Sequence, residues 1–265
     1  MGANSLPRKI IKNLLVPFPR LREYLQTIAM AKDIYTDEWA KKNEPEIFWI
    51  KSTLKPGDVA IDVGANYGLY TYNLSKSVGV DGLVYAFEPI PYTFRTLKRI
   101  TKIFQLNNVK LVNKGCSNSV GKINFSVPLQ ENGTISAGLA FIDINEKNRN
   151  SRLKKGSHTD FTTIKSEIIK IDDLNLKKVS FMKIDVEGAE LLVLKGAVNT
   201  IKKFRPIIMI EIEDRWIESY NIKREDINYF FKQLNYQTNY YSKGALNKCD
   251  IYLKKINNFI FIPQI

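Results

Sequence analysis

Short apolar runs that alternate with helical patterns constrain this 265-residue chain more than any other feature. The runs VAIDV, LVYAFE, VKLVN, VSFMKID and PIIMIEIE are almost continuously apolar, and helical patterns follow several of them. Strands that are apolar throughout are buried on both faces, as in a parallel sheet covered by helices. The sequence therefore predicts an α/β fold built around a doubly wound, mostly parallel sheet.

A carboxylate closes each of the first two apolar runs. Asp62 precedes the glycine turn at Gly64 and Gly68, and Glu88 ends the second run. Ligands of doubly wound sheets bind at the carboxyl ends of the strands, where glycines let the backbone turn tightly beside the ligand. We expect Glu88 to accept hydrogen bonds from two ribose hydroxyls. Asp62 would repel a pyrophosphate but suits the cationic amino-acid end of S-adenosylmethionine.

The glycine spacing separates this turn from that of dinucleotide enzymes. Those enzymes show G-x-G-x-x-G, whereas Asn66 stands here where the second glycine would be. A nicotinamide-dependent oxidoreductase on the same fold is kept as an alternative.

Six stretches resemble the FkbM-type methyltransferases and follow one another in that family's order: IDVGANYGLYT, VYAFEPIPYTFRTL, VNKGCSNSVGKINF, IIKIDDL, FMKIDVEGAELLVLKGA and PIIMIEIE. The similarity covers about residues 54–213. It implies a class I, Rossmann-like fold whose seven-stranded, mostly parallel sheet has its last strand reversed. It also implies an S-adenosylmethionine-dependent O-methyltransferase that acts on a hydroxyl of a sugar, a glycan or a specialised metabolite.

The resemblance further implies a set of cofactor residues by motif position. They follow the first strand, end the second and end the third: Asp62, Gly64, Ala65, Asn66, Gly68, Glu88, Cys116 and Ser117. Residues 115–117 would lie near the adenine, although the family more often has a short apolar pair there.

A second acidic stretch, KIDVEGAE, follows a later apolar run. Asp185 ends that run, so its carboxylate should emerge at the same edge of the sheet as Glu88. A sugar hydroxyl is a poor nucleophile at neutral pH and needs a base or a metal. We expect Asp185 to be the base, with Glu187 as the second candidate and His158, the single histidine, as the third.

Two further groups belong to this expectation. Lys183 shares a strand face with Asp185 and could simply neutralise it. Glu211 ends the next strand, and with Asp185 it could hold a divalent cation through oxygen ligands. One acid per strand end is also what structural capping gives, so a metal is the lesser expectation. Glu190 is expected to serve the helix dipole.

The chain divides into an extension and a catalytic domain. Residues 1–54 are predicted to form an N-terminal helical extension, and residues 55–265 the S-adenosylmethionine-binding domain. In the extension, apolar residues recur at spacings near 3.6, at Leu21, Leu25, Ile28, Ala29 and Ile34. The polar segment 129–162 is long and irregular for a compact domain. We interpret it as an insertion that binds the methyl acceptor.

The net charge of +13 favours an anionic partner, such as an acidic glycan, a nucleotide-linked substrate, nucleic acid or a membrane surface. Lysines spread over the surface for solubility would give the same charge. A nucleic-acid methyltransferase is kept as an alternative, although the Asn/Asp-Pro-Pro-aromatic tetrad of amine-directed enzymes is replaced by DVEG and no RNA-binding module is appended. We expect a small-molecule or glycan acceptor, and peripheral membrane contact by the N-terminal helices stays open.

Cysteine usage and hydropathy bear on the compartment. Cys116 and Cys249 are the two cysteines, which gives neither a disulfide framework nor a metal cluster. No apolar run approaches the roughly 18–20 residues that span a bilayer, and the basic start lacks the pattern of a secretory signal. These features predict a cytoplasmic setting.

Overall fold

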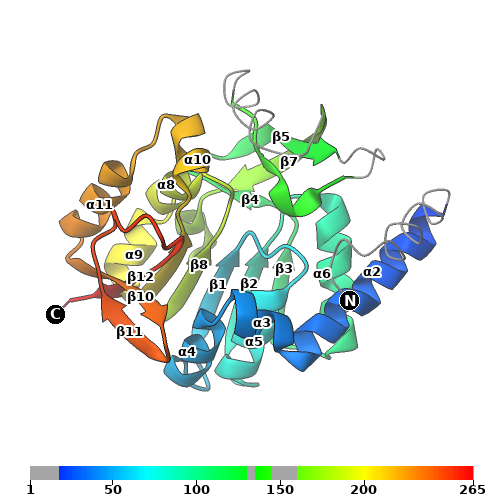
Figure 1. Cartoon of the computed structure of the whole chain (residues 1–265), viewed down its shortest axis with the longest axis horizontal. Helices are drawn as coiled ribbons and strands as arrows, with labels where there is room; N and C mark the ends of the chain where they lie inside the picture. Colours follow the sequence, from blue (N-terminus) through cyan, green and yellow to red (C-terminus); the bar gives the residue numbers. More distant parts are fainter. Residues whose placement is uncertain (1–17, 130–134, 145–159, 265) are drawn as a thin grey trace.

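The computed structural model describes residues 18–129, 135–144 and 160–264 (Figure 1). They form an α/β fold in which helices cover both faces of a large mixed sheet. A smaller sheet lies beyond the carboxyl ends of the parallel strands, at the top of Figure 1.

Eight strands form the large sheet, in the order β11-β10-β12-β9-β8-β1-β2-β3. The five neighbouring strands β9, β8, β1, β2 and β3 pair in parallel, and the last strand in sequence, β12, runs antiparallel to β9, as the family resemblance implies. The count differs from the predicted seven because a hairpin from β10 adds β11 at the edge. The bounds are β1 (Val59–Val63), β2 (Leu83–Phe87), β3 (Val109–Val112), β8 (Phe181–Ile184), β9 (Ile207–Glu211), β10 (Tyr236–Ser242), β11 (Ala245–Lys248) and β12 (Asn258–Pro263).

Helices pack on both faces of this sheet. One face is covered by α4 (Glu46–Thr53), α5 (Leu69–Val78) and α6 (Pro91–Ile103). The other is covered by α8 (Glu190–Lys195), α9 (Val198–Phe204) and α11 (Arg224–Gln233). The remaining described helices and 3-10 turns are α2 (Pro19–Thr36), α3 (Glu38–Asn43), α10 (Asp214–Ile217), η1 (Ala137–Leu139), η2 (Ile171–Leu174) and η3 (Glu218–Tyr220).

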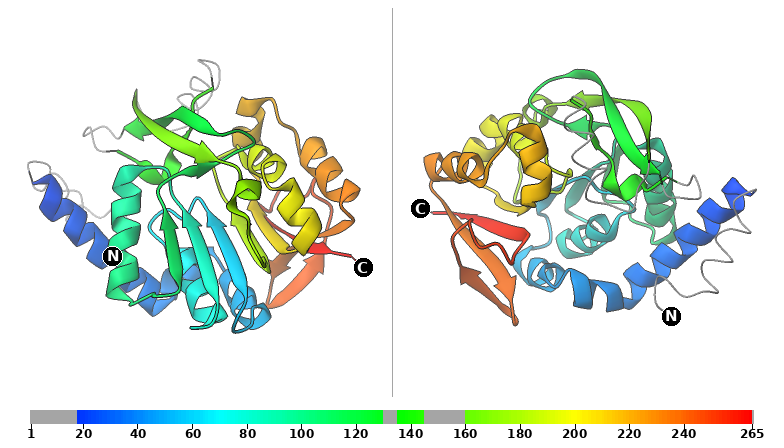
Figure 2. Two further views of the ribbon diagram at one scale, coloured as in Figure 1. Left: turned by 180° about the vertical axis from the view of Figure 1, so that it is seen from behind. Right: turned by 45° about the horizontal axis from the view of Figure 1, so that its top comes forward.

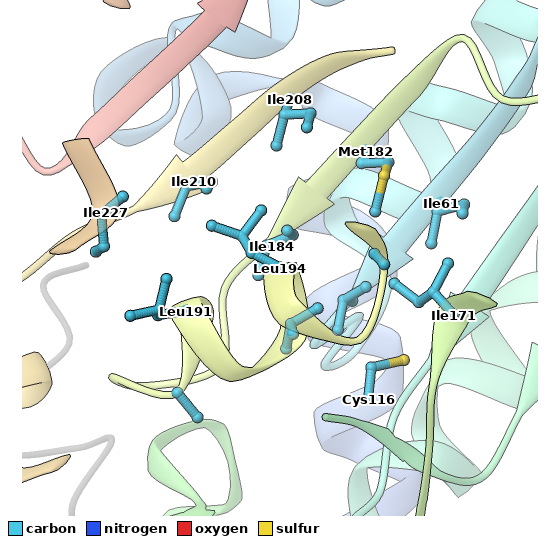
Figure 3. Close-up of a cluster of buried hydrophobic side chains, with 14 of the residues drawn as sticks. Ile61, Cys116, Ile171, Met182, Ile184, Leu191, Leu194, Ile208, Ile210 and Ile227 are labelled. Atoms are coloured by element: carbon cyan, nitrogen blue, oxygen red, sulfur yellow. The ribbon is translucent and has the colours of Figure 1, made fainter. Parts of the chain in front are cut away.

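The largest cluster of buried side chains lies between the sheet and α8 (Figure 3). Met182, Ile184 and Ile210 project from β8 and β9 toward Leu191 and Leu194 of α8, and all of these side chains are buried. Full burial of an aliphatic side chain contributes about 1.5–3 kcal/mol, so this layer fixes β8 and the residues that follow it.

One predicted helix is divided in two. The pattern AELLVLKGAVNTIKKF suggests a single helix, but α8 ends at Lys195 and α9 begins at Val198. A Cβ atom at Gly196 would lie 2.0 Å from the carbonyl oxygen of Ser117, so only glycine fits between the two segments. The run DIYLKKI at residues 250–256 suggests a strand, but it forms a series of turns, and β12 begins only at Asn258.

The predicted apolar face of the N-terminal helix α2 is only partly buried against the domain. Ile34 of α2 is buried, but Leu21, Leu25 and Ile28 are exposed. The side of α2 that packs on the domain carries Glu23 and Thr27 instead. The periodicity correctly predicted a helix, but the apolar stripe points away from the domain.

The small sheet contains the hairpin that flanks the predicted insertion. Its order is β4-β7-β5-β6, with β4 (Gly115–Cys116), β5 (Gly121–Leu129), β6 (Phe141–Ile142) and β7 (Asp160–Ile169). β5 and β7 pair antiparallel over their whole length. The runs KINFSVP and EIIKIDDL suggest antiparallel additions to the large sheet, but β5 and β7 pair with each other in a separate sheet.

Within the described part of the chain, no helix is long and apolar enough to cross a membrane.

Gly64 joins the ends of β1 and β8. Its φ of +78° belongs to the left-handed region, and a Cβ atom there would lie 1.8 Å from the carbonyl oxygen of Asp185. Glycine is therefore required at position 64 because its backbone lies against the end of β8.

We expect Gly64→Ala to destabilise the fold far more than Gly57→Ala. Gly57 has a similar φ of +83° but nothing within 4 Å of its missing Cβ, so its substitution exposes only the backbone strain, about 1–2 kcal/mol. The steric overlap at Gly64 should add at least about 2 kcal/mol. Urea denaturation of both variants measures the difference, and equal losses would show that β1 and β8 can separate without cost.

Candidate active site

A pocket lies at the carboxyl ends of β1, β2 and β8. The lining residues come from the three strand ends and from the small sheet: Val63, Gly64, Asn66, Phe87, Glu88, Pro89, Ile90, Gly115, Cys116, Phe125, Gly138, Ala140, Ile142, Asp185, Val186 and Glu187.

Glu88 is held rigidly at the end of β2. Its Oε2 atom accepts the backbone N–H of Asn66 at 2.9 Å, and its Oε1 atom accepts that of Ile90 at 2.9 Å. Burial raises the pKa of Glu88 to about 7, although both hydrogen bonds act against the rise. The carboxyl group is thus fixed in orientation and poised to change its charge near neutral pH.

The predicted insertion contributes one wall of the pocket. Gly138, in η1, lies against Asn66 so closely that a Cβ atom would meet the Asn66 Nδ2 atom at 2.9 Å. Ala140 and Ile142 line the pocket beside it. The described part of residues 129–162 therefore closes over the loop that follows β1.

Residues 115–117 do not end β3 as expected. Gly115 and Cys116 form β4 of the small sheet, and both line the pocket. Cys116 is buried, and burial raises the pKa of its thiol. This residue therefore contributes a small apolar surface and no reactive thiolate.

Four of the predicted cofactor residues are not among those that line the pocket: Asp62, Ala65, Gly68 and Ser117. Gly68 begins α5 with a φ of +101°, and its missing Cβ faces Leu97 of α6 at 2.6 Å. The Ser117 N–H donates to the Ile169 carbonyl. These residues shape the loops, and their contact with a cofactor stays a prediction.

Asp62 lies on the α5 side of the sheet. Its side chain is fully buried, its Oδ2 atom accepts the Thr71 hydroxyl at 2.6 Å, and its Oδ1 atom has no hydrogen-bond partner. Burial raises its pKa, and the nearby Lys183 opposes the rise. The expected contact with a ligand ammonium would need this side chain to become accessible from the pocket.

Lys183 is the ammonium group that the structure places beside these acids. Its Nζ atom donates to Asp185 Oδ2 at 2.8 Å and lies 4.8 Å from the centre of the Tyr70 ring. Burial opposes its charge, but Asp185 and Asp62 outweigh burial and raise the pKa of Lys183. The expectation that Lys183 neutralises Asp185 is confirmed by this ion pair.

Asp185 and Glu211 behave as one unit at the ends of β8 and β9. Burial opposes the charge of Asp185, but Lys183 outweighs it and lowers the pKa of that carboxyl. For Glu211, burial and the neighbouring Asp185 raise the pKa to about 10. At neutral pH, Glu211 is therefore protonated and donates a hydrogen bond to the Asp185 carboxylate.

A metal at this pair would have to displace the shared proton. Among the residues that the structure describes, no group of three or more His, Cys, Asp or Glu side chains could hold a metal ion. Metal binding by Asp185 and Glu211 stays a prediction, and His158 lies outside the described residues.

The predicted N-terminal extension supplies an acid near this site that no sequence pattern indicated. Glu44, the residue after α3, accepts hydrogen bonds on Oε2 from the Tyr70 hydroxyl at 2.7 Å and from Asn258 Nδ2 at 3.1 Å. Burial raises the pKa of Glu44, and Lys183 opposes the rise. No local pattern could reveal this group, because its partners come from α5 and β12.

The loop after β8 is shaped by Glu190. Its Oε1 atom accepts the backbone N–H groups of Val186 and Gly188, and burial raises its pKa to about 7. Between these N–H groups Glu187 has a φ of +57°, a strained conformation for a residue with a side chain. Glu190 thus does more than serve the helix dipole, because it holds Glu187 at the pocket wall.

The lining of the pocket has a definite chemical character. It combines the apolar side chains of the small sheet with the carboxyl groups of Glu88, Asp185 and Glu187, and it includes no Lys or Arg among the described lining residues. Such a surface suits a cationic ligand with an apolar portion and is poorly suited to a pyrophosphate.

Comparison with known proteins gives a family match. The model of the methyltransferase FkbM domain matches residues 62–238, which include the pocket and most of the large sheet. Hexuronic acid methyltransferase AglP of Haloferax volcanii is 27% identical over 184 residues, covering 69% of this chain and 68% of that protein. Methyltransferase 1 of Beauveria bassiana is 26% identical over 146 residues, covering 51% of this chain and 57% of that protein.

The matched region is thus less than two thirds of the length of the Beauveria protein. Among solved structures, the FkbM methyltransferase from Methylobacillus flagellatus KT is 14% identical, with a TM-score of 0.48 over 82% of this chain and 50% of that chain.

Two substitutions test the charge states at β8 and β9. Lys183→Met leaves Asp62 and Asp185 without their cation, so we expect a loss of about 3–5 kcal/mol near pH 8. The loss should shrink near pH 5, because unpaired buried carboxyl groups take up protons as the pH falls. Glu211→Gln imitates the protonated acid and should cost less than about 1 kcal/mol at both pH values.

Urea denaturation at the two pH values provides the measurement. A loss for Lys183→Met that is independent of pH, or a Glu211→Gln variant as unstable as Lys183→Met, would contradict these charge states.

Proposed function

The chain belongs to the FkbM methyltransferase family, and on that premise we propose that it transfers a methyl group from S-adenosylmethionine to a hydroxyl of a sugar, a glycan or a specialised metabolite. The observation that supports the proposal most directly is the pocket at the ends of β1, β2 and β8, whose described lining holds three carboxyl groups and no basic side chain. A sulfonium cofactor is a cation, so this lining favours it electrostatically.

The residues present fit this cofactor. Glu88 is buried, and each of its carboxyl oxygens accepts one backbone N–H, which leaves acceptor capacity for ribose hydroxyls. The loop from Gly64 to Asn66 and the apolar surface of Cys116 and Phe125 would hold the nucleoside. When bound, the cofactor supplies an electrophilic methyl group.

Asp185 is our candidate for the residue that receives the proton of the acceptor hydroxyl. Its lowered pKa makes it a weak base towards a free hydroxyl. A hydroxyl becomes strongly acidic as its oxygen forms the new bond to carbon, so an anchored carboxylate can accept the proton late in the reaction. Lys183 and Glu211 fix the Asp185 carboxylate, and much of the acceleration would come from positioning.

Two observations support the proposed methyl acceptor and the segment that binds it: the name of a relative and the position of the insertion beside the pocket. The Haloferax relative is named a hexuronic acid methyltransferase, and we propose a sugar or glycan acceptor for this chain as well. Gly138 and Ala140 place the insertion beside the pocket, so it is our candidate for the acceptor-binding segment. The pocket itself is acidic, which gives no local support for the expected anionic acceptor.

Calorimetric titration with S-adenosylhomocysteine, and separately with NAD, tests the cofactor. We expect binding of the former alone, because the acidic lining disfavours a pyrophosphate. Affinity should rise with pH up to about 7 and then level off, since Glu88 must lose its proton to accept both ribose hydroxyls fully. Glu88→Gln should bind more weakly at about pH 8 and lose this pH dependence.

Binding of NAD would overturn the proposed cofactor. If the wild-type affinity for S-adenosylhomocysteine does not change between about pH 6 and 8, the proposed hydrogen bonds from the ribose to Glu88 are wrong. The proposed cofactor would not be affected by that result.

Asp185→Asn tests the transfer step. We expect affinity for S-adenosylhomocysteine to stay within a few fold of the wild type and turnover to fall roughly 100-fold or more, the scale of a lost general base. Glu187→Gln is the matched control at the same pocket wall and should retain more turnover. If Asp185→Asn stays active, the proton acceptor must be sought at Glu187 or His158.

A further inference from the structure

The helix α2 exposes an apolar face that the domain leaves uncovered. Leu21, Leu25 and Ile28 are 49%, 42% and 45% exposed, although all three lie within a helix of 18 residues. The opposite side is packed on the domain through Glu23, whose carboxylate accepts hydrogen bonds from Arg95 and Arg99 of α6. The helix is therefore anchored by these ionic contacts and by the buried Ala31 and Ile34, whereas Leu21, Leu25 and Ile28 point outward.

The exposed face continues at both ends of the helix with aromatic side chains. We call the exposed apolar side chains of α2 and the adjoining α3 the α2 stripe. Its members are Phe18, Leu21, Tyr24, Leu25, Ile28, Tyr35 and Trp39. Aromatic and aliphatic side chains along one face are typical of helices that lie in the interface of a bilayer. Figures 1 and 2 show α2 along the outer side of α6, with its N-terminal end projecting from the domain.

The exposed charges of the two helices that carry the α2 stripe are positive in balance. Arg20 and Lys32 of α2 and Lys41 and Lys42 of α3 are exposed, against exposed Asp33 and Glu38. The first acidic residue of the chain is Glu23, and the 22 residues before it carry five basic ones: Arg8, Lys9, Lys12, Arg20 and Arg22. Glu23 is already paired with Arg95 and Arg99, so its charge does not offset the charge of these five basic residues.

We propose that the α2 stripe docks on an anionic lipid bilayer, with the apolar side chains entering the interface and the neighbouring basic residues facing anionic headgroups. Each basic residue near such a surface strengthens binding by about fivefold, and apolar burial adds to it. A membrane partner accounts for both the aromatic side chains and the basic surroundings.

A second copy of the chain explains these observations less well. The stripe has spacings of three and four residues, as a coiled-coil seam would, but Lys32 falls within that pattern between Ile28 and Tyr35. Two stripes facing each other would bring the basic residues of both copies together. An anionic surface attracts the same residues.

Docking through α2 would also set the position of the pocket. Besides the Glu23 contacts, the Tyr92 hydroxyl of α6 donates to Gln26 of α2. α6 begins immediately after the Glu88 turn, where the Ile90 N–H is bonded to the Glu88 carboxyl. The helix that carries the membrane face is thus joined to the helix that starts at the pocket.

Co-sedimentation of the full chain with vesicles tests the proposal. We expect binding to phosphatidylcholine vesicles that contain phosphatidylglycerol, and little binding to pure phosphatidylcholine. Arg20→Gln combined with Lys32→Gln should weaken binding about 25-fold, whereas Lys254→Gln with Lys255→Gln removes the same charge elsewhere and should have a much smaller effect. Salt at roughly 0.5 M should weaken the wild-type interaction.

A second pair of variants separates the apolar contribution. Leu21→Ser, Leu25→Ser and Ile28→Ser together should weaken vesicle binding more than tenfold, and Val80→Ser with Val120→Ser, which alters exposed apolar residues outside the N-terminal helices, should not. All of these side chains are exposed or on the surface, and an unchanged affinity for S-adenosylhomocysteine shows that each variant is folded.

Three results would overturn the proposal. The first is equal binding to neutral and anionic vesicles, and the second is an equal loss in the control variants. The third is a dimer by light scattering that the triple serine variant converts to a monomer, since a second copy would then cover the α2 stripe.

Discussion

A single buried ammonium group organises the carboxyl edge of the sheet. Lys183 is bonded to Asp185 and lies beside Asp62, so two strands that each end in an acid can pack side by side without mutual repulsion. The proton shared by Asp185 and Glu211 extends the arrangement to β9. Without the cation, several buried carboxyl groups would either repel one another or become neutral. The charge on Asp185, which the proposed reaction needs, depends on this arrangement.

The loops at this edge of the sheet pack so closely that their backbone contacts fix the positions of the side chains they carry. Gly64 contacts the Asp185 carbonyl and Gly138 contacts the Asn66 amide, so the pocket wall has little room to rearrange. Glu88 and Glu190 each use their carboxyl oxygens to hold backbone N–H groups. Burial raises the pKa of both Glu88, which lines the pocket, and Glu190, which holds the loop after β8.

The alternation of strands and helices was enough to predict the fold, because each element is encoded by its own local pattern. It also brought Glu88 and Asp185 to one edge, since parallel strands end together. The pattern could not show that the Asp62 side chain is fully buried and accepts the Thr71 hydroxyl. It also could not show which side of α2 is buried, because the salt bridges of Glu23 anchor that helix together with the buried Ala31 and Ile34. No local pattern predicted the roles of Glu44 and Asn258, because each of them bonds to a residue far away in the sequence.

The hydrogen bond between Glu44 and Asn258 joins residues that are 214 positions apart. It links the segment that precedes the first strand to the strand that enters the sheet last. During synthesis, the chain would leave the ribosome with Glu44 in place long before its amide partner was made. The charged edge of the sheet can therefore reach its final state only after nearly the whole polypeptide has been released, and chains that stop short of β12 should lack a properly formed site rather than merely a missing edge.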